Sequence, residues 1–144
     1  MVRKPHVTLL PGWVDETEPN PGGVLAYFRN PTRSGPLQIS WCEVTGGQPP
    51  QVSEDSLLEM AIQFGEQQFE CGPPIEKASG SCALGSYGSA KFSRPPDRCF
   101  GQVWVLSNGA GFLLATYMSA KVPDPIEVSE AQQIVSRIIL VGPS

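Results

Sequence analysis

Two β-rich segments separated by Asn108-Gly109 constrain the fold of this chain most strongly. Residues 99–107 read CFGQVWVLS and residues 111–119 read GFLLATYMS. An Asn-Gly pair between such segments is the strongest short-range signal of a β-hairpin, because both central residues of a type I′ turn need positive φ. The sequence therefore predicts an antiparallel hairpin with a two-residue turn.

A helix is predicted after this hairpin. Pro123-Asp124-Pro125 breaks the regular structure, and Ser129 with Gln132 three residues later has the pattern of a capping box. Gly142-Pro143 is expected to end the helix. Four residues at helical spacing form its predicted buried stripe: Ile134, Val135, Ile138 and Ile139.

Turn residues are spread evenly between the apolar segments, so we expect a single domain over residues 1–144. Strands are predicted at 7–10, 24–28, 37–44 and 81–92, in addition to the hairpin, with a bend near Gly85 or Gly88. Residues 51–68 are predicted to be a helix capped by Ser53. The resulting order is βββ-α-βββ-α. It indicates an α+β fold, in which an antiparallel sheet of five to six strands carries both helices on one face.

The charge and hydropathy of the chain exclude two kinds of partner. The net charge is −4, whereas a nucleic-acid-binding protein needs a cationic surface. No apolar run approaches the 18 or so residues of a membrane span, and the apolar segment at residues 7–10 is too short for a signal peptide. We therefore expect a cytoplasmic protein without membrane insertion.

The four cysteines are Cys42, Cys71, Cys82 and Cys99, and none has the CxxC spacing of a zinc ribbon or a redox motif. Three of them fall in predicted strands, where a free cysteine behaves as a small apolar residue. Buried free thiols are the expectation, with a disulfide as the main alternative.

Catalytic patterns are absent from the sequence. His6 is the only histidine and lies at the start of the chain, so a nucleophile–base pair built on it is not expected. The acids Glu54, Asp55 and Glu59 fall early in a predicted helix, where they complement the helix dipole. The repeated Gly-Ser pairs between residues 80 and 89 match no phosphate-binding loop. We expect no enzymatic activity, no metal site and no cofactor.

The hairpin presents the one positive indication of function. A two-residue turn would pair Trp104 with Leu113 and Phe100 with Tyr117 on one face of the sheet; a three-residue loop would change this register. If both helices cover the opposite face, this aromatic face remains exposed and is available to a protein partner or a second copy. The predicted partner-binding residues are Phe100, Gln102, Trp104 and Tyr117. The alternative is that loops from residues 11–36 fold over this face.

Five segments together form a pattern of elements: Leu10-Pro11-Gly12-Trp13, Leu37–Trp41, the Leu-Leu-Glu-Met of the first helix, Leu114–Tyr117 and the Glu130–Ile138 helix. In order and spacing this pattern resembles the PsbP-like superfamily, which includes the photosystem II extrinsic protein, the Ran-binding Mog protein and many bacterial proteins. The resemblance implies a layered α/β/α or α/β fold that serves as a binding or accessory module without enzymatic activity. It supplies no site motif, so no functional residue is carried over.

The sequence thus favours a non-enzymatic protein-binding or accessory module. One alternative is a small-ligand carrier or atypical hydrolase, with a pocket between the sheet and the helices under the 81–92 strand. Another alternative is a bacterial immunity or effector-adaptor protein, with which the small size and acidic charge are compatible.

Overall fold

A computed structural model describes residues 4–17, 24–30, 32–43, 53–70, 72–94, 99–109, 111–119 and 123–141. The fold is α+β, as predicted, with two helices and nine strands in these ranges. The strands are β1 (Lys4–His6), β2 (Trp13–Asp15), β3 (Leu25–Arg29), β4 (Leu37–Glu43), β5 (Glu76–Ser81), β6 (Ser86–Arg94), β7 (Cys99–Ser107), β8 (Gly111–Ser119) and β9 (Ile139–Val141). The helices are α1 (Glu54–Phe69) and α2 (Pro125–Ser136).

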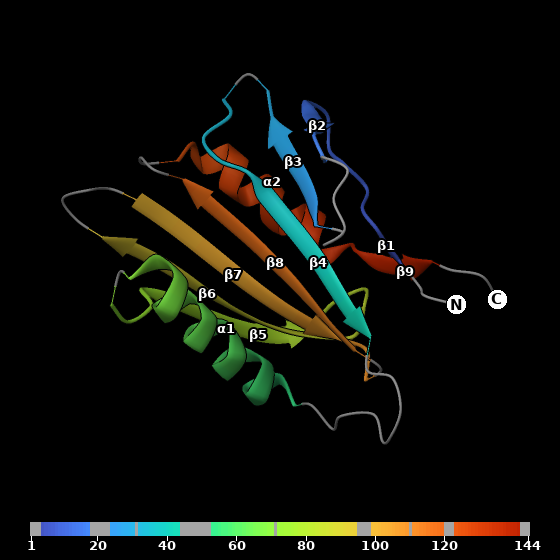
Figure 1. The fold of residues 1–144 in the computed structure, drawn as a ribbon, viewed down its shortest axis with the longest axis vertical. Coiled ribbons are helices and arrows are strands. Elements are labelled where there is room, and N and C mark those ends of the chain that lie inside the picture. Colours follow the sequence, from blue (N-terminus) through green and yellow to red (C-terminus); the bar gives the residue numbers. More distant parts are fainter. Residues whose placement is uncertain are drawn as a thin grey trace.

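Seven antiparallel strands form the main sheet in the order β2-β3-β4-β8-β7-β6-β5, and β1 pairs with β9 beside it (Figure 1). The sheet is wider than the predicted five to six strands because β2 and β5 are added at its two edges. Strand β5 reads EKASGS, which lacks the β-branched and aromatic residues that signal a strand. Its turn into β6 lies at Cys82–Gly85, inside the segment predicted as one continuous strand.

The first and last segments differ from the prediction. Residues 7–10 are not a strand; the strand at this end is β1, three residues earlier. Helix α2 begins at Pro125 rather than Ser129, because the Asp124 carboxylate accepts hydrogen bonds from the backbone N–H groups of Ile126 and Glu127. It ends at Ser136, and Ile139 lies in β9 instead of the buried helical stripe.

The two helices lie on opposite faces of the main sheet, so the predicted one-sided arrangement is wrong. Residues Val103 and Val105 of β7 pack in the same cluster as Leu57 of α1. Their neighbours Trp104 and Leu106 point to the other face and pack in the cluster that contains α2. Figure 1 shows α1 in front of β5 and β6, and α2 behind the sheet. Of the two layer orders implied by the PsbP-like resemblance, α/β/α and α/β, the structure has the first.

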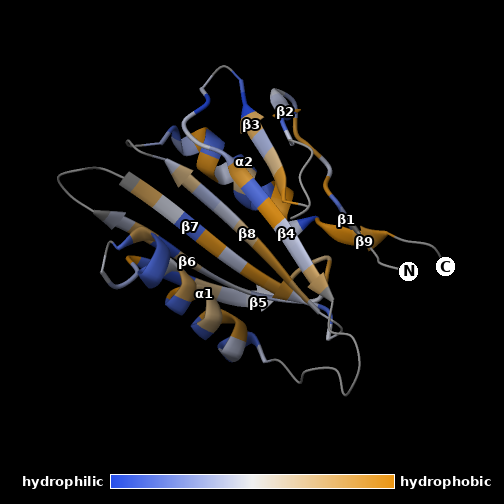
Figure 2. Cartoon of the chain, viewed as in Figure 1, coloured by the Kyte–Doolittle hydropathy of each residue, from blue (hydrophilic) through white to orange (hydrophobic). Residues whose placement is uncertain are grey.

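Helix α1 packs very close to the sheet because each side of the contact contains a glycine that leaves room for a larger neighbour on the other side. A Cβ atom added to Gly88 would lie 2.1 Å from the backbone nitrogen of Leu58, and one added to Gly65 would lie 2.0 Å from the ring of Phe92. The helix also has the predicted Ser53 cap, whose hydroxyl accepts from the Ser56 N–H. Its buried residues are Leu57, Ala61 and Gly65, and Figure 2 shows hydrophobic and hydrophilic positions interspersed along the helix.

Helix α2 packs over large side chains instead of glycines. Its residues Ala131, Ile134 and Val135 lie in one buried cluster with Trp104 and Tyr117 of the hairpin. Tryptophan and tyrosine occupy much more volume than glycine, so this contact is thick where the α1 contact is thin. The two faces of one sheet are therefore covered in two different ways.

The hairpin register differs from the prediction by two residues. Trp104 pairs with Ala115 and Phe100 with Ser119, so residues 108–111 lie beyond the last pair, Ser107 with Phe112. Gly109 has φ +91°, and the Ser107 hydroxyl closes the turn by accepting from its N–H. A shift of two residues leaves every side chain on its predicted face, because side chains alternate with a period of two.

None of the described helices is long and apolar enough to cross a membrane.

Candidate functional site

The four predicted partner-binding residues share one face of the sheet, but this face is not exposed. Gln102, Trp104 and Tyr117 are each exposed by 2% or less, and Phe100 is half-buried with its ring edge-on to that of Tyr117. Helix α2 covers them, so the expected exposed aromatic face was wrong. Their role in partner binding stays a prediction.

Residues 13–15 and 25–29, which the alternative placed in loops over this face, form strands β2 and β3 of the same sheet and contact α2 from its side. The Trp13 indole N–H and the Arg29 guanidinium both donate to Oε1 of Glu130 on α2, at 2.9 Å each. The Trp13 hydrogen bond, together with that of Arg29, lowers the pKa of Glu130. These contacts fasten β2 and β3 to α2.

A fully buried carboxylate, Glu127, joins the same layers from within. It accepts a short hydrogen bond from the Tyr117 hydroxyl, another from Thr32 Oγ1 at 2.5 Å, and one from the Ser34 N–H at 3.3 Å. Burial and the hydrogen bond to Glu127 raise the pKa of Tyr117 well above its usual range, so the phenol remains a donor. The Glu127 carboxylate therefore has its hydrogen-bond donors within the protein, and these bonds hold α2 and the loop before β4 against the sheet.

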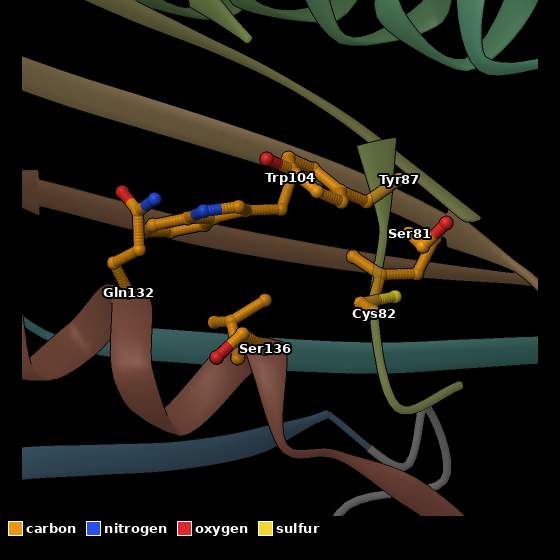
Figure 3. A pocket seen from close by; sticks show the side chains of 8 residues that line it. Ser81, Cys82, Tyr87, Trp104, Gln132 and Ser136 are labelled. Carbon is orange, nitrogen blue, oxygen red and sulfur yellow. The ribbon is translucent and has the colours of Figure 1, made fainter. Parts of the chain in front are cut away.

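A pocket of about 130 Å³ lies between the C-terminal end of α2 and the sheet (Figure 3). We call it the α2 pocket. Trp104 and Leu106 of β7 and Tyr87 of β6 form its sheet side, and α2 forms the other side. Its described lining is Ser81, Cys82, Tyr87, Trp104, Leu106, Gln132, Val135 and Ser136. The Cys82–Gly85 turn is held at its edge by a hydrogen bond from the Ala83 N–H to the Ser136 carbonyl, 3.1 Å long.

Polar atoms beside this pocket are incompletely paired. The Gln102 amide nitrogen donates to Oε1 of Gln132 at 3.2 Å. Gln102 Oε1 and the indole Nε1 of Trp104, both buried, have no hydrogen-bond partner among the described residues. Buried polar atoms are nearly always paired, so each such atom calls for an explanation.

The pocket is suited to binding rather than to acid–base catalysis. Its described lining contains no carboxylate, lysine, arginine or histidine. The hydroxyl of Ser136 is hydrogen-bonded to the Gln133 carbonyl of its own helix at 3.0 Å. In the described ranges of the chain, no three His, Cys, Asp or Glu side chains gather as metal ligands would.

A second open region lies on the opposite face of the sheet. Helix α1 covers β5, β6 and β7 there and its cluster reaches Phe112 and Leu114 of β8, whereas no described element stands in front of β3 and β4 (Figure 1). We call this region the open sheet face. By strand alternation it comprises Ala26, Phe28, Gln38, Ser40, Cys42, Phe112, Leu114, Thr116 and Met118. All are half-buried or exposed, Met118 by 50%, and a shallow groove of about 180 Å³ runs between them and Phe64 of α1.

The sequence interpretation missed this surface because it assigned Phe112, Leu114, Thr116 and Met118 to the face beneath the helices. The sequence contained a partial indication that this face is open. Thr116 and Gln38, which pair across β8 and β4, are polar on a face otherwise expected to be covered. Ser81, Cys82 and Tyr87 of the 81–92 segment do line the α2 pocket, but the small-ligand alternative for this region stays a prediction.

The cysteines differ from the expected buried thiols. Cys42 is exposed on the open sheet face, and Cys82 is a half-buried free thiol at the α2 pocket. Cys71 and the side chain of Cys99 lie outside the described part of the chain.

No family model matches this sequence, and no curated protein has a significant sequence match to it. Solved structures do match its fold. The solution structure of cyanobacterial PsbP (CyanoP) from Synechocystis sp. PCC 6803 gives a TM-score of 0.54 at 11% identity, covering 96% of this chain and 93% of CyanoP. A crystal structure from Bacteroides thetaiotaomicron VPI-5482 gives 0.52 at 12% identity; it covers 93% of this chain, which spans only 44% of that protein. The protein therefore has a PsbP-like fold.

Proposed function

We propose that residues 1–144 form a single-domain, non-enzymatic accessory module that binds a protein partner through the open sheet face. The observation that carries this proposal is the combination of exposure and charge on that face. Its strand residues are half-buried or exposed, and none of them is charged. Depletion of charged residues is typical of the centre of a protein interface.

The shape and edges of the open sheet face support a protein rather than a small molecule as its occupant. The groove beside Phe64 is shallow, and the face extends across three strands. At its border the Arg33 guanidinium lies 4.4 Å from the centre of the Phe28 ring and also pairs with Glu16. An apolar centre with a polar rim is the usual anatomy of an interface.

The chemistry of the described residues supports a non-enzymatic role. The buried carboxylate Glu127 is occupied by Tyr117, Thr32 and Ser34, and the α2 pocket has no charged lining. The PsbP-like fold agrees with the same role, since the family resemblance implies an accessory module. The partner would recognise the flat face and not a catalytic centre.

Thr116→Arg tests this proposal, because Thr116 is central and half-exposed, so that the new charge points out of the folded protein. Affinity capture from native lysate should lose the partner that wild type retains, with binding weaker by about 30-fold, since a charge buried at an interface centre costs about 2 kcal/mol. Gln63→Arg places the same side chain on the exposed surface of α1 as a control. The partner, once identified by mass spectrometry, is then titrated against each purified variant.

Two results distinguish the outcomes. If Thr116→Arg retains every partner of the Gln63→Arg control, the open sheet face is not the binding surface. If the captured partner is the chain itself, sedimentation of wild type should show a dimer that Thr116→Arg dissociates. Thermal unfolding of both variants within a few degrees of wild type confirms that the fold is intact.

A further inference from the structure

The α2 pocket has the size of a single ring. Its volume of about 130 Å³ is close to that of an engineered apolar protein cavity of about 150 Å³ that binds benzene. Drug-sized ligands and cofactors occupy pockets of roughly 300–1,000 Å³. The pocket therefore admits a six-membered ring with one small substituent and excludes a nucleotide.

The walls of the pocket favour an aromatic ring. The Trp104 indole lies along the pocket, and the Tyr87 ring lies beside it (Figure 3). Leu106 and Val135 add aliphatic surface from the sheet and from α2. Aromatic rings gain from offset or edge-to-face contacts with such side chains, in addition to the apolar area that they bury.

The polar atoms restrict the substituent. The indole Nε1 of Trp104 has no partner among the described residues, although Trp104 is 98% buried, and it can only donate a hydrogen bond. Figure 3 shows the nitrogen side of the indole directed toward the Gln132 end of the pocket. A ligand oxygen at that end would accept this hydrogen bond. A charged ligand has no counter-ion in the described lining and would lose its hydration.

We infer that the α2 pocket binds a small, neutral, monocyclic aromatic alcohol, with its ring between Trp104, Tyr87 and Val135 and its oxygen accepting from Trp104 Nε1. The site lies on the opposite side of the sheet from the open sheet face. The inference is therefore independent of the proposed protein partner, and no residue tested for one function belongs to the other.

Phenol is the probe, titrated into full-length ¹⁵N-labelled protein while the indole N–H resonances are followed by NMR. The Trp104 resonance, assigned with Trp104→Phe, should move saturably with a dissociation constant of about 1 mM, as expected for a ligand of so few atoms. The resonances of Trp13 and Trp41 should move much less. Benzoate, which has the same ring and a negative charge, should bind at least about 10-fold more weakly.

A matched pair of variants at the exposed position Ser136 locates the binding. Ser136→Leu should fill the mouth of the pocket and abolish the shift of the Trp104 resonance. Ser136→Ala removes only a hydroxyl that is bonded within its own helix, so it should bind phenol as wild type does. Both substitutions are compatible with a helix, and circular dichroism checks that each variant is folded.

Three outcomes would overturn the inference. The first is a Trp104 resonance that does not respond to saturating phenol. The second is phenol binding that Ser136→Leu leaves unchanged, which would place the ligand elsewhere. The third is N-acetyl-tyrosinamide binding at least 10-fold more tightly than phenol, which would assign the pocket to a side chain of a protein partner.

Discussion

Helices α1 and α2 pack against the two faces of the same sheet at different distances. Helix α1 touches the sheet through glycine, with the backbone of Leu58 directly against Gly88. Helix α2 stands off the sheet on Trp104, Tyr117 and other large side chains, and it is held there by the buried carboxylate of Glu127. The difference shows how one sheet carries a thin and a thick contact on its two faces.

The thickness of each contact determines where open space remains. Under α1 the backbone of Leu58 lies directly against Gly88 of β6. Under α2 the space between the helix and the sheet is filled by large side chains alone. The α2 pocket is the part of this space beside Trp104, Leu106 and Tyr87 that these side chains do not fill. Each helix also covers only part of its face, which leaves the open sheet face beside α1.

Removing the Glu127 carboxylate should have the largest effect on stability. Glu127→Ala leaves the Tyr117 hydroxyl, the Thr32 hydroxyl and the Ser34 N–H without their acceptor. Because each unsatisfied buried donor costs about 1–3 kcal/mol, we expect a loss of about 4 kcal/mol in the free energy of unfolding, measured by urea denaturation. Glu127→Gln retains an acceptor oxygen and should lose less than half as much. Equal losses for the two variants would show that the thick contact does not depend on these hydrogen bonds.

Thickening the thin contact should have the next largest effect. Gly88→Ala places a methyl group 2.1 Å from the backbone nitrogen of Leu58, and a backbone cannot rotate away as a side chain can. We expect a loss of about 3 kcal/mol in the free energy of unfolding, since overpacking a tight core costs 1–3 kcal/mol and occasionally more. Gly80→Ala, in the neighbouring strand β5, meets only the Tyr87 ring at 3.3 Å and is the control. A stability of Gly88→Ala equal to that of this control would contradict the close approach of α1.

A hydroxyl deletion isolates one hydrogen bond of the thick contact. Tyr117→Phe keeps the ring packed against Phe100 and removes only the donor to Glu127. The expected loss is about 2 kcal/mol, because hydrogen bonds to charged groups contribute about 1.5–3 kcal/mol. In a double-mutant cycle with Glu127→Gln, the two losses should not add. Additive losses would mean that the two side chains are not coupled.

The smallest expected effect is a pH-dependent change in stability from Glu130 of α2, which is bound by Trp13 and Arg29. The folded pKa of Glu130 is lowered from its usual 4.5 by the Trp13 N–H and Arg29. A depressed folded pKa contributes stability above the unfolded pKa and loses it as the pH falls through the folded value. The stability difference between wild type and Glu130→Gln should therefore be below about 1 kcal/mol at pH 7, since the pair is partly exposed, and should shrink below about pH 4.5. A difference that grows on acidification would contradict this, and denaturation at pH 7 and pH 3.5 measures it.

The candidate sites could be predicted only in part. Alternation in the hairpin correctly placed Gln102, Trp104 and Tyr117 on one face, and a register shift of two residues did not disturb this. Their exposure was not predictable, because the apolar stripe of α2 fits either face of β7 equally well. The start of α2 was missed since Asp124 and Ser129 are both good caps, and only the burial of Glu127 decides between them.

The α+β class, the antiparallel hairpin, the Ser53-capped helix and the face to which each hairpin side chain belongs follow from local periodicity and capping, so the amino-acid sequence was enough to predict them. The face that each helix covers, the two edge strands, and the positions of the α2 pocket and the open sheet face depend on packing between distant segments and became known only from the folded chain. Local patterns state which side chains must be buried but not against what. That choice depends on the space between layers, and here glycine on one face and tryptophan on the other make that space unequal.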